Sequence, residues 1–386
     1  MEFREHFCLK DRHSFTIDAA INAEDARFYF GRPETKERLQ KQLRRSFTQP
    51  GVPKIVVFGP YGSGKTQTLY YMEHLLLNGE VTSCRLKPRT VHYNLDIHGN
   101  SNAGDWHLQM LEALGKDAVT QWVGSLFEKV ADLRGELAVL FDGDSNMVAA
   151  ANRLREPAGP GMTAWRWLAG QKLSNPELET LGVTRNLGTT GASDFVSVLV
   201  GVGRLAQRND ETVIFFVDEA EQLHDAGKAD CIESLKDYMR KLAEPANNSV
   251  GIVVGAMGHT LDDLAASLMH DSVTSRIGKQ NYIELTFMAA VDTVHSFLSE
   301  MLGELIDRDA AEKRIHEDKL GVTLDTYPFT DEAFGLFCTY ASEDPSKALP
   351  RQIIMALNEC AIEAWDQGKA TVDESIVNDT CPIVFG

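Results

Sequence analysis

Cysteine is sparse in this sequence of 386 residues, and it forms no recognisable metal-binding pattern. The six cysteines are scattered, with no CxxC pair and no histidine cluster beside any of them. This pattern argues against a disulfide-stapled secreted domain and against a zinc module. No stretch approaches the roughly 20 apolar residues that span a bilayer, and the first residues lack the apolar core of a signal peptide. We therefore expect a cytoplasmic protein with reduced cysteines and no membrane partner.

Positive charge is also scarce, because 38 Lys and Arg stand against 56 Asp and Glu, a formal net charge of -18. The shortage is uneven: residues 1–90 hold 15 basic and 10 acidic side chains, and residues 91–386 hold 23 and 46. A broad face for polyanions is therefore not expected, although a local basic patch remains open. Repeats of fixed period and low-complexity segments are absent from the sequence. The length itself exceeds what one hydrophobic core usually supports, so we expect two or three domains.

What the sequence does contain is a glycine-rich stretch, KIVVFGPYGSGKTQ, at residues 54–67. The β-branched run before the glycines predicts a strand, and TLYYMEHLLL after them predicts a helix. Glycines let successive backbone N–H groups turn toward phosphates, and the helix N-terminus adds partial positive charge. Lys65 can reach the β- and γ-phosphates, and the Thr66 hydroxyl can ligate Mg²⁺. The candidate nucleotide-binding residues here are Gly59, Pro60, Tyr61, Gly62, Ser63, Gly64, Lys65, Thr66 and Gln67. The plainer alternative is an ordinary glycine-rich turn between strand and helix.

An acidic pair follows a second apolar run, ETVIFFV, at residues 211–217. This run predicts an interior strand of a parallel sheet, which would deliver Asp218 and Glu219 to its carboxyl end, where open α/β sheets bind ligands. Asp218 suits Mg²⁺ coordination, and Glu219 can polarise a water for attack on the γ-phosphate. The alternative is a helix N-cap followed by an acid in the first turn.

A long segment separates these two motifs. Lys65 and Asp218 are 218 − 65 = 153 residues apart, whereas two strand-helix-strand units need only about 60 residues. We therefore predict an insertion at about 98–208, and its patterns are mostly helical. Four of the five tryptophans lie inside it, at positions 106, 122, 165 and 167. They predict the core of a helical subdomain, or else a face that meets a partner.

Two arginines further along the chain are candidate phosphate ligands. Arg276 precedes the last predicted strand, and from there it could reach the phosphates of a neighbouring subunit as an arginine finger. Lys279 is a weaker candidate for the same role. Arg351 follows Pro350 in the first turn of a predicted helix, where the macrodipole disfavours a cation unless an anion is near. That anion is either a nucleotide phosphate or an acid such as Glu343 or Asp344.

Together these stretches resemble the AAA+ ATPases, and most closely their origin-initiator-like branch. Phe30-Gly31-Arg32 is similar to the entry motif, residues 59–66 to Walker A, and residues 213–219 to Walker B. Ser275-Arg276 resembles the arginine finger, and Leu349-Pro350-Arg351 resembles the second sensor. The resemblance implies an α/β P-loop NTPase with a five-stranded parallel sheet, the phosphate-loop strand central, a helical insertion and a C-terminal helical lid. It also implies ATP and Mg²⁺ as cofactors and an ATP-dependent homo-oligomer.

The sequence departs from the family where the first sensor is expected, near residues 255–260. Gly258 takes the position usually held by a polar residue, which leaves His259 or Thr260 as substitutes. The insertion and the DEAEQL segment also bear a faint resemblance to ATPases of bacterial phage-defence systems. We predict an N-terminal extension at 1–27, a nucleotide-binding domain at 28–288 and a lid at 289–386.

The expected function is that of an ATPase acting as an oligomeric motor or switch on a protein effector, DNA or RNA. A slow nucleotide-gated scaffold that holds an effector is the alternative, and the weakened first sensor favours it. A small-molecule kinase is a third reading, but it gives Arg276 no role in a neighbouring subunit.

Overall fold

The computed structural model describes residues 2–10, 12–48 and 51–386, and the chain divides into two compact units. The first, here called the sheet unit, comprises Leu39–Gly59 and Met72–Glu284. The second, here called the lid unit, comprises Met1–Arg38, Pro60–Tyr71 and Leu285–Gly386. The predicted boundaries at 27, 288 and 289 remain predictions.

The sheet unit contains a five-stranded parallel sheet in the order β2-β3-β4-β1-β5. Its strands are β1 (Lys54–Gly59), β2 (Lys87–Asn94), β3 (Glu211–Asp218), β4 (Val250–Met257) and β5 (Tyr282–Glu284). The α/β fold class predicted from the sequence is thereby confirmed. The expectation of a central phosphate-loop strand is corrected, because β4 is the middle strand and β1 lies between β4 and β5. Strand β2 lies at the edge of the sheet, where its polar first residues can stay in water.

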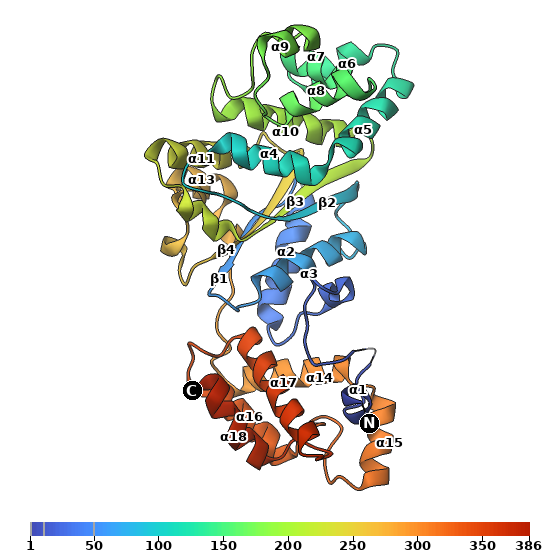
Figure 1. Cartoon of the computed structure of the whole chain (residues 1–386), viewed down its shortest axis with the longest axis vertical. Coiled ribbons are helices and arrows are strands. Elements are labelled where there is room, and N and C mark those ends of the chain that lie inside the picture. Colours follow the sequence, from blue (N-terminus) through green and yellow to red (C-terminus); the bar gives the residue numbers. More distant parts are fainter. Residues whose placement is uncertain (1, 11, 49–50) are drawn as a thin grey trace. The chain divides into compact units, whose positions relative to one another are not determined.

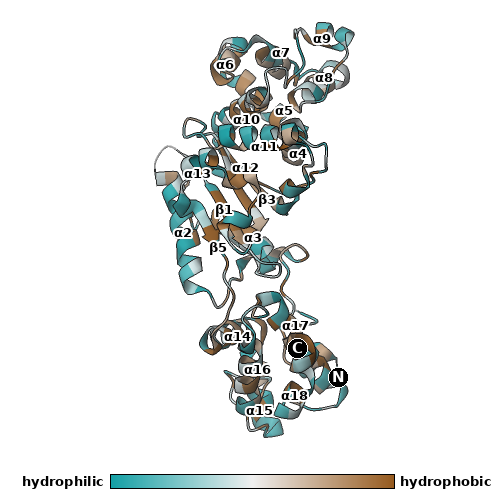
Figure 2. Cartoon of the chain, turned by 90° about the vertical axis from the view of Figure 1, so that its left-hand side faces the viewer, coloured by the Kyte–Doolittle hydropathy of each residue, from teal (hydrophilic) through white to brown (hydrophobic). Residues whose placement is uncertain are grey.

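The sheet is apolar on both faces, which suits a parallel sheet covered on both sides. Val213, Phe215 and Val217 of β3 belong to one large core cluster. This cluster includes residues of helices α4 (Ala103–Leu114), α10 (Ala192–Gln207) and α11 (Ala229–Leu242). The intervening Ile214 and Phe216 are just as buried but lie outside that cluster, as the alternation of side chains along a strand requires. Figure 2 shows brown, hydrophobic residues along much of β1 and β3.

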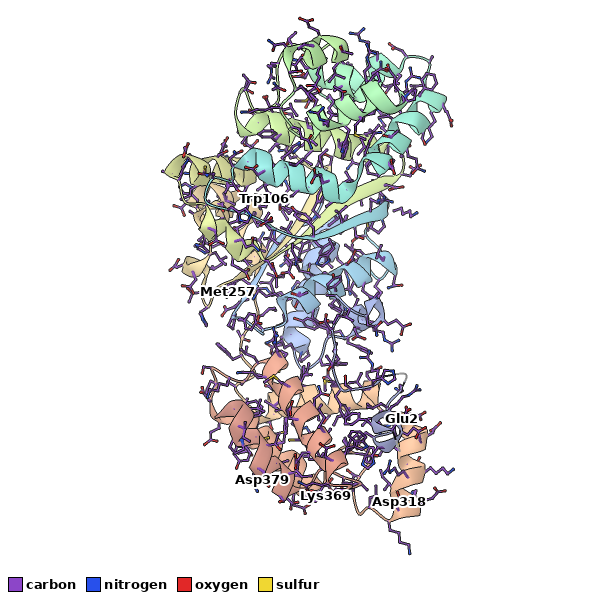
Figure 3. All side chains as sticks on the ribbon, in the orientation of Figure 1. Glu2, Trp106, Met257, Asp318, Lys369 and Asp379 are labelled. Carbon is purple, nitrogen blue, oxygen red and sulfur yellow. The ribbon has the colours of Figure 1, made fainter. Side chains whose placement is uncertain are left out.

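The insertion between β2 and β3 is helical, as predicted from its patterns. Helices α4 and α10 lie on the sheet, and α6 to α9 lie beyond them (Figure 1). Their bounds are α4 (Ala103–Leu114), α5 (Lys116–Lys129), α6 (Leu133–Leu140), α7 (Ser145–Arg153), α8 (Ala158–Leu168), α9 (Asn175–Leu181) and α10 (Ala192–Gln207). All four tryptophans of the insertion are buried, which confirms that they form its core rather than an exposed face. Trp106, labelled in Figure 3, belongs to α4. Its indole N–H donates to the Tyr93 hydroxyl of β2 at 2.9 Å.

The remaining elements of the sheet unit connect β3, β4 and β5. They are η2 (Ala220–Asp225), α11 (Ala229–Leu242), η3 (Leu261–Asp263), α12 (Ala266–Met269), α13 (Asp271–Ile277) and η4 (Lys279–Asn281). Helices α2 (Pro33–Thr48) and α3 (Lys65–Leu77) each contribute residues to both units. No helix of the described residues is long and apolar enough to cross a membrane.

The lid unit is helical, and its core includes the N-terminal segment. Its elements are α1 (Phe3–His6), η1 (Ala23–Arg27), α14 (Val291–Leu305), α15 (Arg308–Asp318), α16 (Asp331–Glu343), α17 (Pro350–Asp366) and α18 (Glu374–Phe385). Phe7 and Phe15 are fully buried among the lid helices, and Leu9 pairs with Ile306 in an antiparallel bridge. The N-terminal residues are therefore part of the lid's hydrophobic core.

Candidate functional site

The glycine-rich loop that the sequence predicts to bind phosphate, here called the phosphate loop, begins where β1 ends at Gly59 and runs into α3 at Lys65. Gly62 and Gly64 have φ angles of 82° and 90°, a left-handed region that favours glycine. A Cβ at Gly62 would also lie 3.4 Å from Cβ of Arg351. The Lys65 ammonium donates to the carbonyl of Pro60 at 3.2 Å. The sequence therefore builds the tight loop that its glycine spacing predicts.

Arg32 fastens this loop from the lid unit's N-terminal segment. One of its nitrogens, Nη1, donates to the carbonyl of Ser63 at 2.7 Å, and Nη2 donates to the carbonyl of Thr286 at 2.6 Å. Burial lowers the pKa of Arg32 from its ordinary value. The bonds tie the loop to the first residues after β5. The sequence placed Arg32 in an entry motif but gave no signal for this double contact, since its partners are 31 and 254 residues away.

Gln67, in the first turn of α3, also binds the N-terminal segment of the lid unit. Its Nε2 donates to the carbonyls of Asp25 and Phe28 at 2.6 and 2.8 Å. Beside it, the rings of Tyr29 and Tyr71 stack with their centroids 4.9 Å apart. The segment 25–32, which includes the predicted entry motif Phe30-Gly31-Arg32, is thus held against the loop and the first turns of α3.

Arg351 also reaches the phosphate loop within the lid unit. Its guanidinium lies 4.9 Å from the ring centroid of Tyr61 and donates to the Tyr61 hydroxyl, and its backbone N–H donates to the carbonyl of Gly62 at 3.4 Å. The suggested alternative partner, Asp344, instead lies beside Lys347 and Ser346. The lid unit therefore gathers two arginines, Arg32 and Arg351, at one glycine-rich loop.

The acidic pair lies at the carboxyl edge of the sheet. Asp218 ends β3 and is 4% exposed, and one of its carboxylate oxygens accepts the Glu219 N–H at 2.9 Å. Glu219 follows in a left-handed conformation with φ 57°, and it is exposed. The register pairs Asp218 with Asn94 and Gly59 with Met257, so β1, β2, β3 and β4 all end at this edge. The alternative reading as an N-cap does not describe this pair, because Glu219 itself precedes η2 and makes no side-chain cap bond.

At the strand end expected to carry the first sensor, Gly258 is followed by His259 and Thr260, whose side chains remain the predicted substitutes. Gly258 is buried, and its N–H donates to the carbonyl of Gly59 at 3.2 Å. Thr260 caps η3 in a reciprocal capping box with Asp263, which engages its hydroxyl. The N–H of His259 donates to the same Asp263 carboxylate at 2.8 Å. Met257, labelled in Figure 3 at the end of β4, donates its N–H to Glu221 at 3.0 Å.

Arg276 lies on the short helix α13 of the sheet unit. Its Nη1 donates to the carbonyl of Ser272 four residues earlier, and its Nε lies 3.9 Å from the carboxylate of Glu244. The Arg276 side chain is 30% exposed, and Lys279 is exposed on η4. A trans-acting Arg276 would have to exchange the Glu244 carboxylate for phosphate oxygens.

The residues proposed for a cation have suitable chemistry. Thr66 and Asp218 offer a hydroxyl and a carboxylate, the hard oxygen ligands that Mg²⁺ prefers. Among the described residues, no group of three or more His, Cys, Asp or Glu side chains is arranged to hold a metal ion by itself.

Comparison with solved structures identifies the fold class. The chain is similar to the ORC2 protein of Aeropyrum pernix in its ADPNP–ADP complexes, with a TM-score of 0.53, 12% identity, and coverage of 97% of this chain and 72% of that one. The ADP form of the same protein gives a TM-score of 0.52 at 14% identity, with coverage of 97% and 73%. The chain shares the fold of this protein, in keeping with the α/β P-loop NTPase fold class predicted from the sequence.

A third structure, Cdc6p of Pyrobaculum aerophilum, gives a TM-score of 0.47 at 14% identity, and the match covers 88% of this chain but 64% of that one. The chain thus spans less than two thirds of that protein. No protein-family model and no curated protein matches the chain.

Proposed function

We propose that this chain binds ATP with Mg²⁺ and hydrolyses it to ADP and phosphate as an oligomeric AAA+ motor or switch. The observation that carries the proposal is that β1 and β3 end at the same edge of one parallel sheet. The glycine loop therefore starts at the edge where Asp218 and Glu219 are presented, which is where open α/β sheets bind ligands.

Each residue has a defined part in the proposed reaction. Loop N–H groups and Lys65 hold the β- and γ-phosphates, while Thr66 and Asp218 would hold Mg²⁺, which neutralises phosphate charge. Glu219 accepts a proton from a water molecule while the oxygen of that water forms a bond to the γ-phosphorus. The bond from that phosphorus to the β–γ bridging oxygen breaks, and ADP leaves with the electron pair. Arg351 of the same subunit and Arg276 of a neighbour stabilise the spreading negative charge.

A slow nucleotide-gated scaffold remains the second candidate, and the first-sensor position supports it. Gly258 has no side chain to orient water, and Thr260 is engaged as a helix cap. Turnover per subunit separates the two, because a motor is expected to hydrolyse about one ATP per second or faster. A small-molecule kinase would instead release ADP faster when an acceptor is added.

The test of nucleotide binding is the Lys65→Ala variant. We expect ATP affinity to fall by about 10- to 200-fold, because a charge-assisted hydrogen bond worth roughly 1.5–3 kcal/mol is lost. Isothermal titration with ATP and ADP measures this, and Lys36→Ala, at an exposed position on α2, is the control. Equal affinity of the Lys65 variant and the wild type would rule out the loop as the phosphate site.

We further propose that the partner is a nucleic acid, in addition to a protein effector. The support is a basic surface of the sheet unit, formed by Lys41, Arg44, Arg45, Arg85, Lys87 and Arg89, all exposed. Residues 38–48 and 81–90 contain no acidic side chain, although the whole chain carries a net charge of -18. The Ser83 hydroxyl donates to the carbonyl of Arg44 at 2.9 Å and joins the two segments.

The position of this basic surface separates it from the proposed nucleotide site. Helix α2 ends shortly before β1 begins, and Arg85 lies two residues before β2 begins. The surface therefore gathers at the amino edge of the sheet, opposite the carboxyl edge with Asp218. Lysine and arginine there can contact a sugar-phosphate backbone regardless of its sequence.

The charge-swap variant Arg44→Glu/Arg45→Glu tests the basic surface. We expect at least a tenfold loss of affinity for labelled DNA or RNA and a shallower salt dependence, by about one unit of slope for each lost phosphate contact. Fluorescence anisotropy across a salt series, with single-stranded DNA, duplex DNA and RNA in turn, measures both. Lys129→Glu/Arg134→Glu makes the same change of net charge on the insertion. Equal weakening by both pairs would mean that only the overall charge matters.

The biological setting we propose is defence against phage, on the faint sequence resemblance of the insertion and the DEAEQL segment. The insertion would then be the part that meets the protein effector.

A further inference from the structure

The insertion is fastened at its root to the segment that carries Glu219. Residues 97–103, here called the insertion root, lead from β2 into α4. Three hydrogen bonds join this root to the chain after η2: Gly227 N–H to the Gly99 carbonyl at 3.1 Å, Cys231 Sγ to the Asn100 carbonyl at 3.5 Å, and Ala103 N–H to Ser234 Oγ at 3.3 Å. Gly99 and Gly227 approach so closely that a Cβ on Gly227 would lie 3.4 Å from the Gly99 oxygen.

A fourth bond of the root involves Gln222, which also contacts the proposed water-activating residue. The Gln222 side-chain carbonyl accepts the N–H of Ile97 at 3.2 Å. Its amide nitrogen donates to a carboxylate oxygen of Glu219 at 3.2 Å. A side-chain amide can do both, because it has an acceptor on one atom and donors on the other, whereas an ionised carboxylate only accepts. Gln222 therefore bridges the insertion root and Glu219.

The orientation of the Glu219 side chain depends on its hydrogen bond with Gln222. The backbone of Glu219 is in the left-handed region, and its side chain is exposed. An exposed carboxylate rotates among several rotamers unless a neighbour holds it. The Gln222 bond selects one orientation, and a misplacement of about 1 Å in a catalytic group costs on the order of 10²-fold in rate.

The insertion can transmit a displacement to its root. Helix α4 begins directly after the root with a capping box between Asn102 and Asp105. Ala103 and Trp106 are buried in the core that α4 shares with α11. Because packed interiors deform little, a shift of α4 would carry the root with it.

We propose that Gln222 is a positioning residue for Glu219, and that it links the orientation of Glu219 to the insertion. A partner that binds the insertion and displaces α4 would then change the rate of hydrolysis without touching the nucleotide. This inference rests on the proposed ATPase function and assigns the insertion a part in regulating it.

The test compares Gln222→Leu with Gln109→Leu. Gln109 of α4 also makes two side-chain hydrogen bonds, both to Asp96, the residue before Ile97. It accepts the Asp96 N–H at 2.8 Å and donates to the Asp96 carbonyl at 2.6 Å, and it has no hydrogen bond to Glu219 among those described. We expect Gln222→Leu to lower kcat about tenfold and to change KM less than about twofold. The tenfold loss corresponds to about 1.4 kcal/mol of transition-state stabilisation, which is lost when Glu219 is no longer held in one orientation. Gln109→Leu should keep the wild-type kcat. Gln222→Glu, which places two carboxylates together, should lower kcat at least as much as Gln222→Leu.

A double variant distinguishes positioning from general destabilisation. In a Glu219→Gln background, Gln222→Leu should cause no further loss of kcat, because the group that it positions is already inactive. A wild-type kcat for Gln222→Leu, or an equal loss for Gln109→Leu, would overturn the inference and leave the ATPase proposal intact. Absence of ATP hydrolysis by the wild type, or full hydrolysis by Glu219→Gln, would instead overturn the ATPase proposal, and this inference with it.

Discussion

Glu219→Gln is expected to bind ATP normally and to hydrolyse it about 10²–10⁴ times more slowly than the wild type. The substitution keeps the shape of the side chain and removes its capacity to accept a proton from water. Asp218 remains in place to hold the cation, so binding should survive. Single-turnover hydrolysis and ATP affinity measured on the same sample separate the two effects.

The control for this expectation is Glu221→Gln. Glu221 lies two residues further along, but its carboxylate accepts the backbone N–H of Met257 at 3.0 Å. It therefore has a structural partner, and its loss should affect stability more than the chemical step. If Glu221→Gln stops hydrolysis while Glu219→Gln does not, the roles of the two acids are reversed. Mass measurement of the Glu219 variant with ATP should also show whether an ATP-bound oligomer accumulates.

The sequence predicts those parts of the fold that depend on local patterns. The apolar runs at 54–59 and 211–218 form β1 and β3, because a strand buried on both faces is recognisable from its own composition. The glycines of the phosphate loop are equally local, since φ angles of 82° and 90° favour glycine at 62 and 64.

The contacts that organise the candidate site lie beyond such patterns. Arg351 and Tyr61 are separated by 290 residues, and Gln222 and Ile97 by 125. Nothing in the residues around Gln222 distinguishes a bridging glutamine from a solvent-exposed one. The packing of Phe7 and Phe15 into the lid core is also not predictable from local patterns, because their partners come from helices near the other end of the chain. Such pairings depend on the tertiary fold.

Arg276→Ala is expected to assemble with ATP as the wild type does and to lose about 10³–10⁵ in turnover. An arginine finger acts on charge that develops in the transition state, so its removal should affect kcat far more than nucleotide affinity. Arg240→Ala is the matched control, because Arg240 Nη1 also pairs with Glu244, at 3.3 Å. This variant removes a different ion pair of the same Glu244 carboxylate and leaves the proposed finger in place.

Mixing two inactive variants tests whether Arg276 acts on a neighbouring subunit. A Glu219→Gln subunit keeps its finger and lacks its base, whereas an Arg276→Ala subunit keeps its base and lacks its finger. In a mixed oligomer, some interfaces combine the intact base of one subunit with the intact finger of the other, and hydrolysis should return to a fraction of the wild-type rate. If the mixture stays inactive although mass measurement shows mixed oligomers, Arg276 serves its own subunit or has no catalytic part. Arg276 would then have only a structural role, through its contacts with Ser272 and Glu244 within the sheet unit.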